Sequence, residues 1–116
     1  MPPVFTERQE RAITLLHHAS AALNREPCTA ADIEEAVDHA TQALRLADND
    51  NGIKSVANII LGGCHENQDK WNLAYYEYKA AREQCEGRWT NELEQTFQYC
   101  LCKLRLAING ASTNIE

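Results

Sequence analysis

Proline is confined to the first quarter of this 116-residue chain, and that distribution most strongly limits what the chain can fold into. The three prolines occupy positions 2, 3 and 27, so the 89 residues from Cys28 to the end contain none. A proline inside a helix removes a backbone hydrogen bond and clashes with the preceding turn, so a long proline-free stretch leaves helices uninterrupted. β-Branched residues, which favour strands, are also sparse there. The sequence therefore predicts an all-α protein.

Capping residues and turn residues divide the chain into five expected helices. Thr6 with Gln9 has the spacing of a capping box, and Thr29 with Asp32 can begin a second helix. The run from Asp48 to Gly52 is typical of a turn, and Gly87 is a stop signal. Thr90 or Asn91 is expected to cap the last helix. The expected helices cover roughly residues 6–25, 29–47, 53–67, 70–86 and 91–108.

The length suits a single domain, and the composition is that of a globular protein. A hydrophobic fraction of 44% and a charged fraction of 24% lie near the averages for folded domains. We expect one helical domain over residues 6–108, with flexible termini at residues 1–5 and 109–116. Short connections between the helices favour antiparallel neighbours.

The third and fourth expected helices carry a pattern of small and aromatic residues at fixed spacing. Ala74, Tyr78 and Ala81 follow Gly62 by 12, 16 and 19 residues. In this pattern the chain resembles the tetratricopeptide repeat family, whose helix pairs stack into a superhelix. The residues that carry the resemblance, and that are expected to pack the repeat, are Leu61, Gly62, Trp71, Ala74, Tyr78 and Ala81.

Small side chains at these positions would let two helix backbones approach closely, with the aromatic side chains filling the space beside them. A weaker copy of the pattern lies in the second helix, where Ala36 precedes Ala74 by 38 residues. We therefore expect five antiparallel helices stacked as two degenerate repeats plus a C-terminal capping helix. The alternative is an irregular five-helix bundle in which the small residues only permit close packing.

The resemblance also implies a binding surface, because the first helix of each repeat lines the inner face of such a stack. The register set by Leu61 and Gly62 places six residues of the third helix on that face. This candidate partner-binding groove consists of Val56, Ile59, Ile60, Gly63, Glu66 and Asn67. Its apolar members favour a partner with hydrophobic anchors, unless the first or last helix covers them and makes them core. Ile60 and Gly63 stand where family members that clamp acidic chaperone tails need polar side chains, so that activity is not expected.

Charge and cysteine content exclude several classes of function. A net charge of −6 disfavours nucleic acid and anionic membranes as partners, since both attract clustered basic residues. The uncharged run of residues 55–65, like every other uncharged run in the sequence, is too short to span a bilayer. Five cysteines without a CxxC pair indicate free thiols, and with no signal-peptide pattern they favour a cytoplasmic location.

The sequence offers no arrangement typical of an active site or a metal site. Gly62 and Gly63 lie inside a helix and are followed by no phosphate-loop lysine. The neighbouring pairs His17-His18 and Cys64-His65 point about 100° apart on a helix, so neither pair can chelate an ion alone. We expect a non-enzymatic adaptor or small chaperone without cofactor or metal, which binds a peptide or helix of another protein. The alternative is a structural subunit that homo-oligomerises through its apolar helix faces.

Overall fold

The computed structural model describes residues 4–113 of the chain. It confirms the all-α class, because these residues form five helices and no strand. The order along the chain is α1 (Glu7–Leu23), α2 (Ala30–Leu46), α3 (Asn51–Asn67), α4 (Trp71–Gln84) and α5 (Asn91–Thr113). Residues 1–3 and 114–116, part of the two termini expected to be flexible, lie outside the described residues.

The first two helices begin at the caps that the sequence predicts, Thr6 and Thr29. The Thr6 hydroxyl accepts a hydrogen bond from the Gln9 backbone N–H at 3.1 Å, and the Gln9 side chain accepts one from the Thr6 backbone. Thr29 and Asp32 make the same reciprocal pair at the start of α2. Each box satisfies backbone donors that the first helical turn cannot pair internally.

The other helix boundaries differ from expectation by a few residues. α3 begins at Asn51 instead of Ile53, because the Asp50 carboxylate accepts the Ile53 N–H at 2.9 Å and caps the helix earlier. α4 ends at Gln84, two residues before the expected end. At the start of α5, the Thr90 hydroxyl accepts the Leu93 N–H. α5 continues to Thr113, five residues past its expected end at Ile108.

Left-handed residues after α2, α3 and α4 reverse the chain direction. Asp48, Asp69 and Glu86 have φ values of 55°, 57° and 53°, and Gly87 follows with 86°. Residues in this conformation end helices by bending the backbone back onto the last carbonyls. Asp48 and Glu86 are 38 residues apart, the same offset that separates Ala36 from Ala74. The ends of α2 and α4 are therefore equivalent points of two helix pairs.

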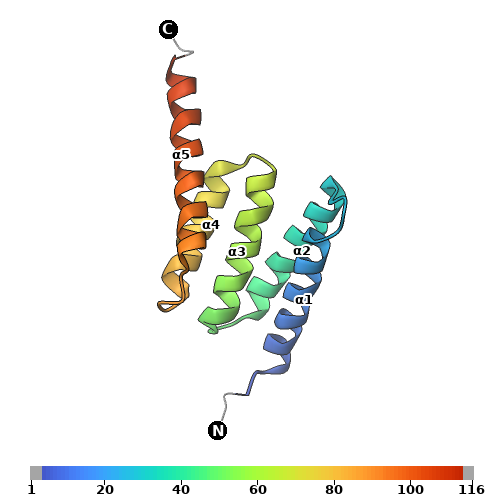
Figure 1. Cartoon of the computed structure of the whole chain (residues 1–116). Helices are drawn as coiled ribbons and strands as arrows, with labels where there is room; N and C mark the ends of the chain where they lie inside the picture. Colours follow the sequence, from blue (N-terminus) through green and yellow to red (C-terminus); the bar gives the residue numbers. More distant parts are fainter. Residues whose placement is uncertain (1–3, 114–116) are drawn as a thin grey trace.

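The helices pack as consecutive antiparallel pairs that stack side by side (Figure 1). α1 packs against α2 and α3 against α4; α3 also lies on α2 and touches α1, and α5 packs on α4. Alanines dominate the buried positions of α1 and α2 and let these backbones lie close together. The core between the two pairs is built from Ala12, Leu16, Ala19, Ala22, Ala36, Ala40, Ala43, Ala47, Ile53, Ala57, Leu61 and Cys64.

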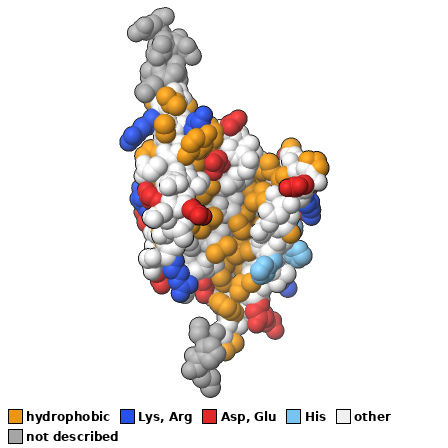
Figure 2. Space-filling model, viewed as in Figure 1, with side chains coloured by type: hydrophobic (Ala, Val, Ile, Leu, Met, Phe, Trp, Pro, Cys, Tyr) orange, Lys and Arg blue, Asp and Glu red, His pale blue; other side chains and the backbone are white. Residues whose placement is uncertain are grey.

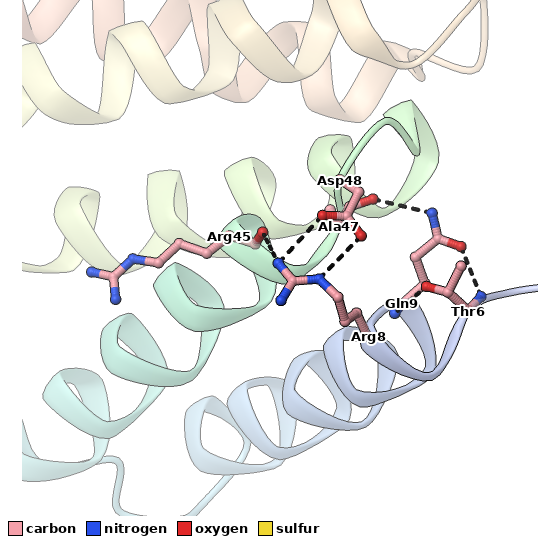
Figure 3. Close-up of polar contacts among 6 residues, drawn as sticks. All are labelled: Thr6, Arg8, Gln9, Arg45, Ala47 and Asp48. Carbon is pink, nitrogen blue, oxygen red and sulfur yellow. Dashed lines mark hydrogen bonds and ion pairs between the residues drawn. The ribbon is translucent and has the colours of Figure 1, made fainter.

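A polar contact ties the beginning of α1 to the end of α2 (Figure 3). The Arg8 guanidinium donates to both carboxylate oxygens of Asp48 at 3.3 Å and to the Arg45 carbonyl at 3.4 Å. Next to it, the Gln9 amide donates to the Ala47 carbonyl at 3.3 Å. Donors placed here neutralise the free carbonyls at the C-terminus of α2. The contact fixes the α1–α2 pair at the end where the chain turns into α3.

α5 ends the described stack with a largely polar outer face. Its residues Phe97 and Cys100 are buried on the side that packs against α4, and Leu93 on α5 is half-buried. The opposite side is exposed and carries Gln95, Gln98, Cys102 and Arg105, together with Leu106, which is 60% exposed. Helical stacks need a terminal helix of this kind, since an apolar outer face would be left open to water.

Candidate functional site

A groove runs along one face of the stack, between α1 on one side and the beginning of α5 on the other. Its volume is about 1040 Å³, and α3 forms its floor. In Figure 2 hydrophobic side chains make a continuous band along this hollow. The groove is lined by Phe5, Ile13, Leu16, His17, Ser20, Asn49, Asp50, Asn51, Gly52, Ile53, Ser55, Val56, Ile59, Ile60, Gln84, Cys85, Glu86, Arg88 and Leu93.

The floor is apolar because α3 turns one helical face toward the groove. Val56, Ile59 and Ile60 stand three and four positions apart, so their side chains share that face. Val56 is 46% exposed, whereas Ile59 and Ile60 are half-buried. Ile60 packs against the core of α1 and α2, and Ile59 against the core of α4 and α5. The floor is thus only partly core, and its exposed surface is aliphatic.

The walls are apolar near the floor and polar at the rim. On α1, Ile13 and Leu16 face the groove, and His17 stands at its edge. On the other side the connection after α4 contributes Glu86 and Arg88, both exposed. The carboxylate of Asp50 lies at the end of the groove, where it caps α3. Acidic and basic side chains both line the groove, so we expect the hydrophobic effect to dominate the binding of a partner there.

Three of the six residues expected in the groove do not line it. Glu66 accepts a hydrogen bond from the Tyr78 hydroxyl at 3.0 Å and is therefore directed toward α4. Asn67 donates to the Gly63 carbonyl of its own helix at 2.8 Å. Gly63 is half-buried one turn beyond Ile59 and Ile60, near the Tyr78 hydroxyl. The groove instead extends toward the beginning of α3, to Ile53 and Gly52.

Of the residues expected to pack the repeat, Gly62 and Tyr78 bring α3 against α4, whereas Leu61 packs in the core with α1 and α2. Gly62, Leu61, Ala74 and Ala81 are buried, and Tyr78 is only 3% exposed. A Cβ added at Gly62 would lie 2.8 Å from two atoms of the Tyr78 ring, so only a residue without a side chain leaves room for the ring here. Trp71 is half-buried and packs differently, with its ring edge-on to Tyr99 of α5 at 5.8 Å between centroids.

Polar pairs between α3 and α4 accompany this packing. The Ser55 hydroxyl donates to the Ala81 carbonyl at 3.2 Å, and the Asn58 amide donates to the Gln84 side chain at 2.9 Å. Farther along, His65 pairs with Glu77. Burial raises the pKa of Glu77, and the neighbouring His65 partly opposes that rise.

Sequence reasoning missed these partners. Asn58 and His65 lie outside the pattern of small and aromatic residues on which the sequence analysis relied, so that pattern did not mark them as partners of α4. The available signal was spacing: Ser55 and Asn58 precede their partners by 26 residues, and His65 precedes Glu77 by 12.

The described residues hold no group of three or more His, Cys, Asp or Glu side chains placed to bind a metal ion. His18 and His39 meet across α1 and α2 with their ring centroids 5.8 Å apart. All five cysteines are free thiols, and Cys64 and Cys100 are buried. Burial raises the pKa of each of these two thiols to about 11, which suppresses the reactive thiolate.

None of the five helices described is both long and apolar enough to cross a membrane. No protein-family model, curated protein or solved structure matches this chain significantly.

Proposed function

We propose that this chain is a non-enzymatic adaptor or small chaperone of the tetratricopeptide type, which binds a helix or extended peptide of another protein in the groove. The observation that carries the proposal is the aliphatic floor that α3 presents inside a hollow of about 1040 Å³, with Val56 46% exposed. Concave surfaces of helical stacks characteristically take such segments. We further propose an intracellular location, supported by the five free thiols.

The chemistry of the groove selects the kind of segment. Val56, Ile59 and Ile60 offer aliphatic contacts, so the partner needs two or three hydrophobic anchors on one side. Burying apolar surface contributes roughly 25 cal/mol per Å², which makes these anchors the main source of affinity. Asp50, Glu86 and Arg88 at the rim suit polar or charged residues that flank the anchors.

The proposal is tested by capturing partners with matched variants. Val56→Glu places a charge on the groove floor, and Leu73→Glu places the same charge on α4, outside the groove lining, at a comparable 43% exposure. Each variant protein serves as bait, the retained proteins are identified by mass spectrometry, and the candidate partner is then purified and titrated. We expect the Val56 variant to lose the partner at least tenfold in affinity while the Leu73 variant keeps it, because a buried unpaired charge opposes docking.

Thermal melting of both variants separates binding from folding. Both side chains are substantially exposed, so both proteins should melt close to the parent protein. A partner that the Val56 variant binds as tightly as the parent does would show that binding occurs elsewhere, and the groove would lose its proposed role.

A further inference from the structure

The apolar face of α5 is longer than the surface it packs on. Its first half, Leu93 to Cys100, lies against α4. Leu104, Ala107 and Ile108 continue the same face at helical spacing, but the upper part of α5 extends beyond the other helices (Figure 1). Ile108 is consequently 56% exposed, and Ala107 is exposed as well. A helix end whose apolar face has no partner among residues 4–113 is only marginally stable in water.

This helix end also carries charge of the opposite sign to the rest of the molecule. The eight residues from Leu101 to Ile108 contain Lys103 and Arg105 and no acidic side chain, a net charge of +2. The whole chain has a net charge of −6, so the residues outside this segment have a net charge of −8. Figure 2 shows basic side chains beside hydrophobic ones on this part of α5. A basic, apolar helix end and an acidic body with an apolar groove are complementary.

We infer that the groove of one copy binds the projecting end of α5 from a second copy. Leu104, Ala107 and Ile108 stand at positions i, i+3 and i+4, the spacing with which an amphipathic helix anchors in a groove. They dock on Val56, Ile59 and Ile60 of the other chain. Arg105 then approaches a rim where two carboxylates, Asp50 and Glu86, outnumber the one arginine, Arg88. The inference rests on the proposed function, because it uses the same groove.

The contact joins two different surfaces, a helix end and a groove. If each of two molecules docks its α5 in the groove of the other, the contact gives a closed dimer. If the docking is not reciprocal, the contact gives an open linear assembly. In either case a foreign partner must displace α5 before it binds. Self-association thus lowers the apparent affinity for that partner at high protein concentration and shields the groove when the partner is absent.

Two point variants, each blocking one half of the contact, test the inference by multi-angle light scattering on the full chain. Ile108→Glu blocks the helix end, and Val56→Glu blocks the groove. Each has a matched control: Leu106→Glu on the opposite side of the same helix end, where the side chain is 60% exposed, and Leu73→Glu on α4. We expect the parent protein and both controls to exceed the 13.1 kDa chain mass as concentration rises, and the two blocked variants to remain at 13.1 kDa.

An equimolar mixture of the two blocked variants decides how the surfaces pair. The Val56 variant keeps an intact α5 and the Ile108 variant keeps an intact groove, so the mixture should reach twice 13.1 kDa. A mixture that stays at the mass of one chain would show that an intact α5 of one chain does not dock in an intact groove of another, and the inference would fall. A parent protein that stays at 13.1 kDa at every concentration would overturn it directly.

These outcomes are separate from those that test the proposed function. A monomeric parent whose Val56→Glu variant still loses a purified foreign partner removes the self-association and leaves the adaptor role intact. Self-association through α5, with no foreign protein bound in the groove, removes the adaptor role instead and favours a structural subunit.

Discussion

Gly62 lies where α3 comes close to α4, and replacing that residue by alanine tests the packing of these two helices. A Cβ at this position would lie 2.8 Å from Cε1 and Cζ of Tyr78 and 3.0 Å from Cε2. The ring cannot easily withdraw, because it is buried and its hydroxyl is held by Glu66 at 3.0 Å. The added methyl group must therefore push the two helices apart or distort the ring.

Gly63→Ala provides a matched control. A Cβ there would meet only the Tyr78 hydroxyl at 3.8 Å, an ordinary contact. Both glycines lie inside α3, so both substitutions gain the roughly 0.5–1 kcal/mol by which alanine favours a helix. That gain cancels in the comparison. The difference between the variants isolates the overpacking, which costs about 1–3 kcal/mol in a well-packed core.

Urea unfolding followed by far-UV circular dichroism measures both variants. We expect Gly63→Ala to be more stable than the parent by roughly 0.5–1 kcal/mol, and Gly62→Ala to be less stable than Gly63→Ala by about 1–3 kcal/mol. For a chain of this size each kcal/mol corresponds to roughly 3–6 °C in melting temperature. Equal stability of the two variants would refute the close approach of the helices at Gly62.

Three further predictions concern local features. Thr29→Ala removes the side-chain cap of α2 and should cost about 1 kcal/mol in the same urea assay, since the Asp32 backbone N–H loses its acceptor; no loss would contradict the capping box. The pKa of Asp32 is lowered, first by its hydrogen bond from the Thr29 backbone and then by Arg25. The stability that the Asp32 carboxylate contributes is therefore present above about pH 4 and is lost as the pH falls further. The free energy of unfolding of Asp32→Asn should accordingly decline less steeply in acid than that of the parent. Cys64 and Cys100 should react with iodoacetamide far more slowly than the exposed thiols of the folded chain, as followed by peptide mapping, and equal rates would show that they are not buried.

Local signals in the sequence predicted much of the fold. Thr6 and Thr29 begin helices because their hydroxyl groups bond backbone atoms only three residues away, and such short-range chemistry is visible without a structure. The spacing of Gly62 and Tyr78 likewise indicated which faces of α3 and α4 are small and which are bulky. These features depend on neighbours along the chain or within one helix pair.

The candidate site was less predictable, because it depends on contacts between distant segments. Glu66 lies at a position that helical register assigns to the groove, yet the Tyr78 hydroxyl draws its carboxylate toward α4. Periodicity identified the apolar face of α5, but nothing in the sequence shows where the supporting surface of α4 ends along that face. The walls formed by Leu16 and Leu93 depend on how the helices stack, which spacing within one helix does not specify.

The claim on which the account depends is that α1, α3 and α5 leave an apolar groove that another polypeptide fills. Hydroxyl-radical footprinting with mass spectrometry tests it in one measurement, on dilute protein with and without a captured partner. We predict that Val56, Ile59 and Ile60 are oxidised in the free chain and protected in the complex, while Leu73 and Tyr76 on α4 react equally in both. Protection of the α4 side chains with unchanged oxidation of the α3 floor would contradict the account.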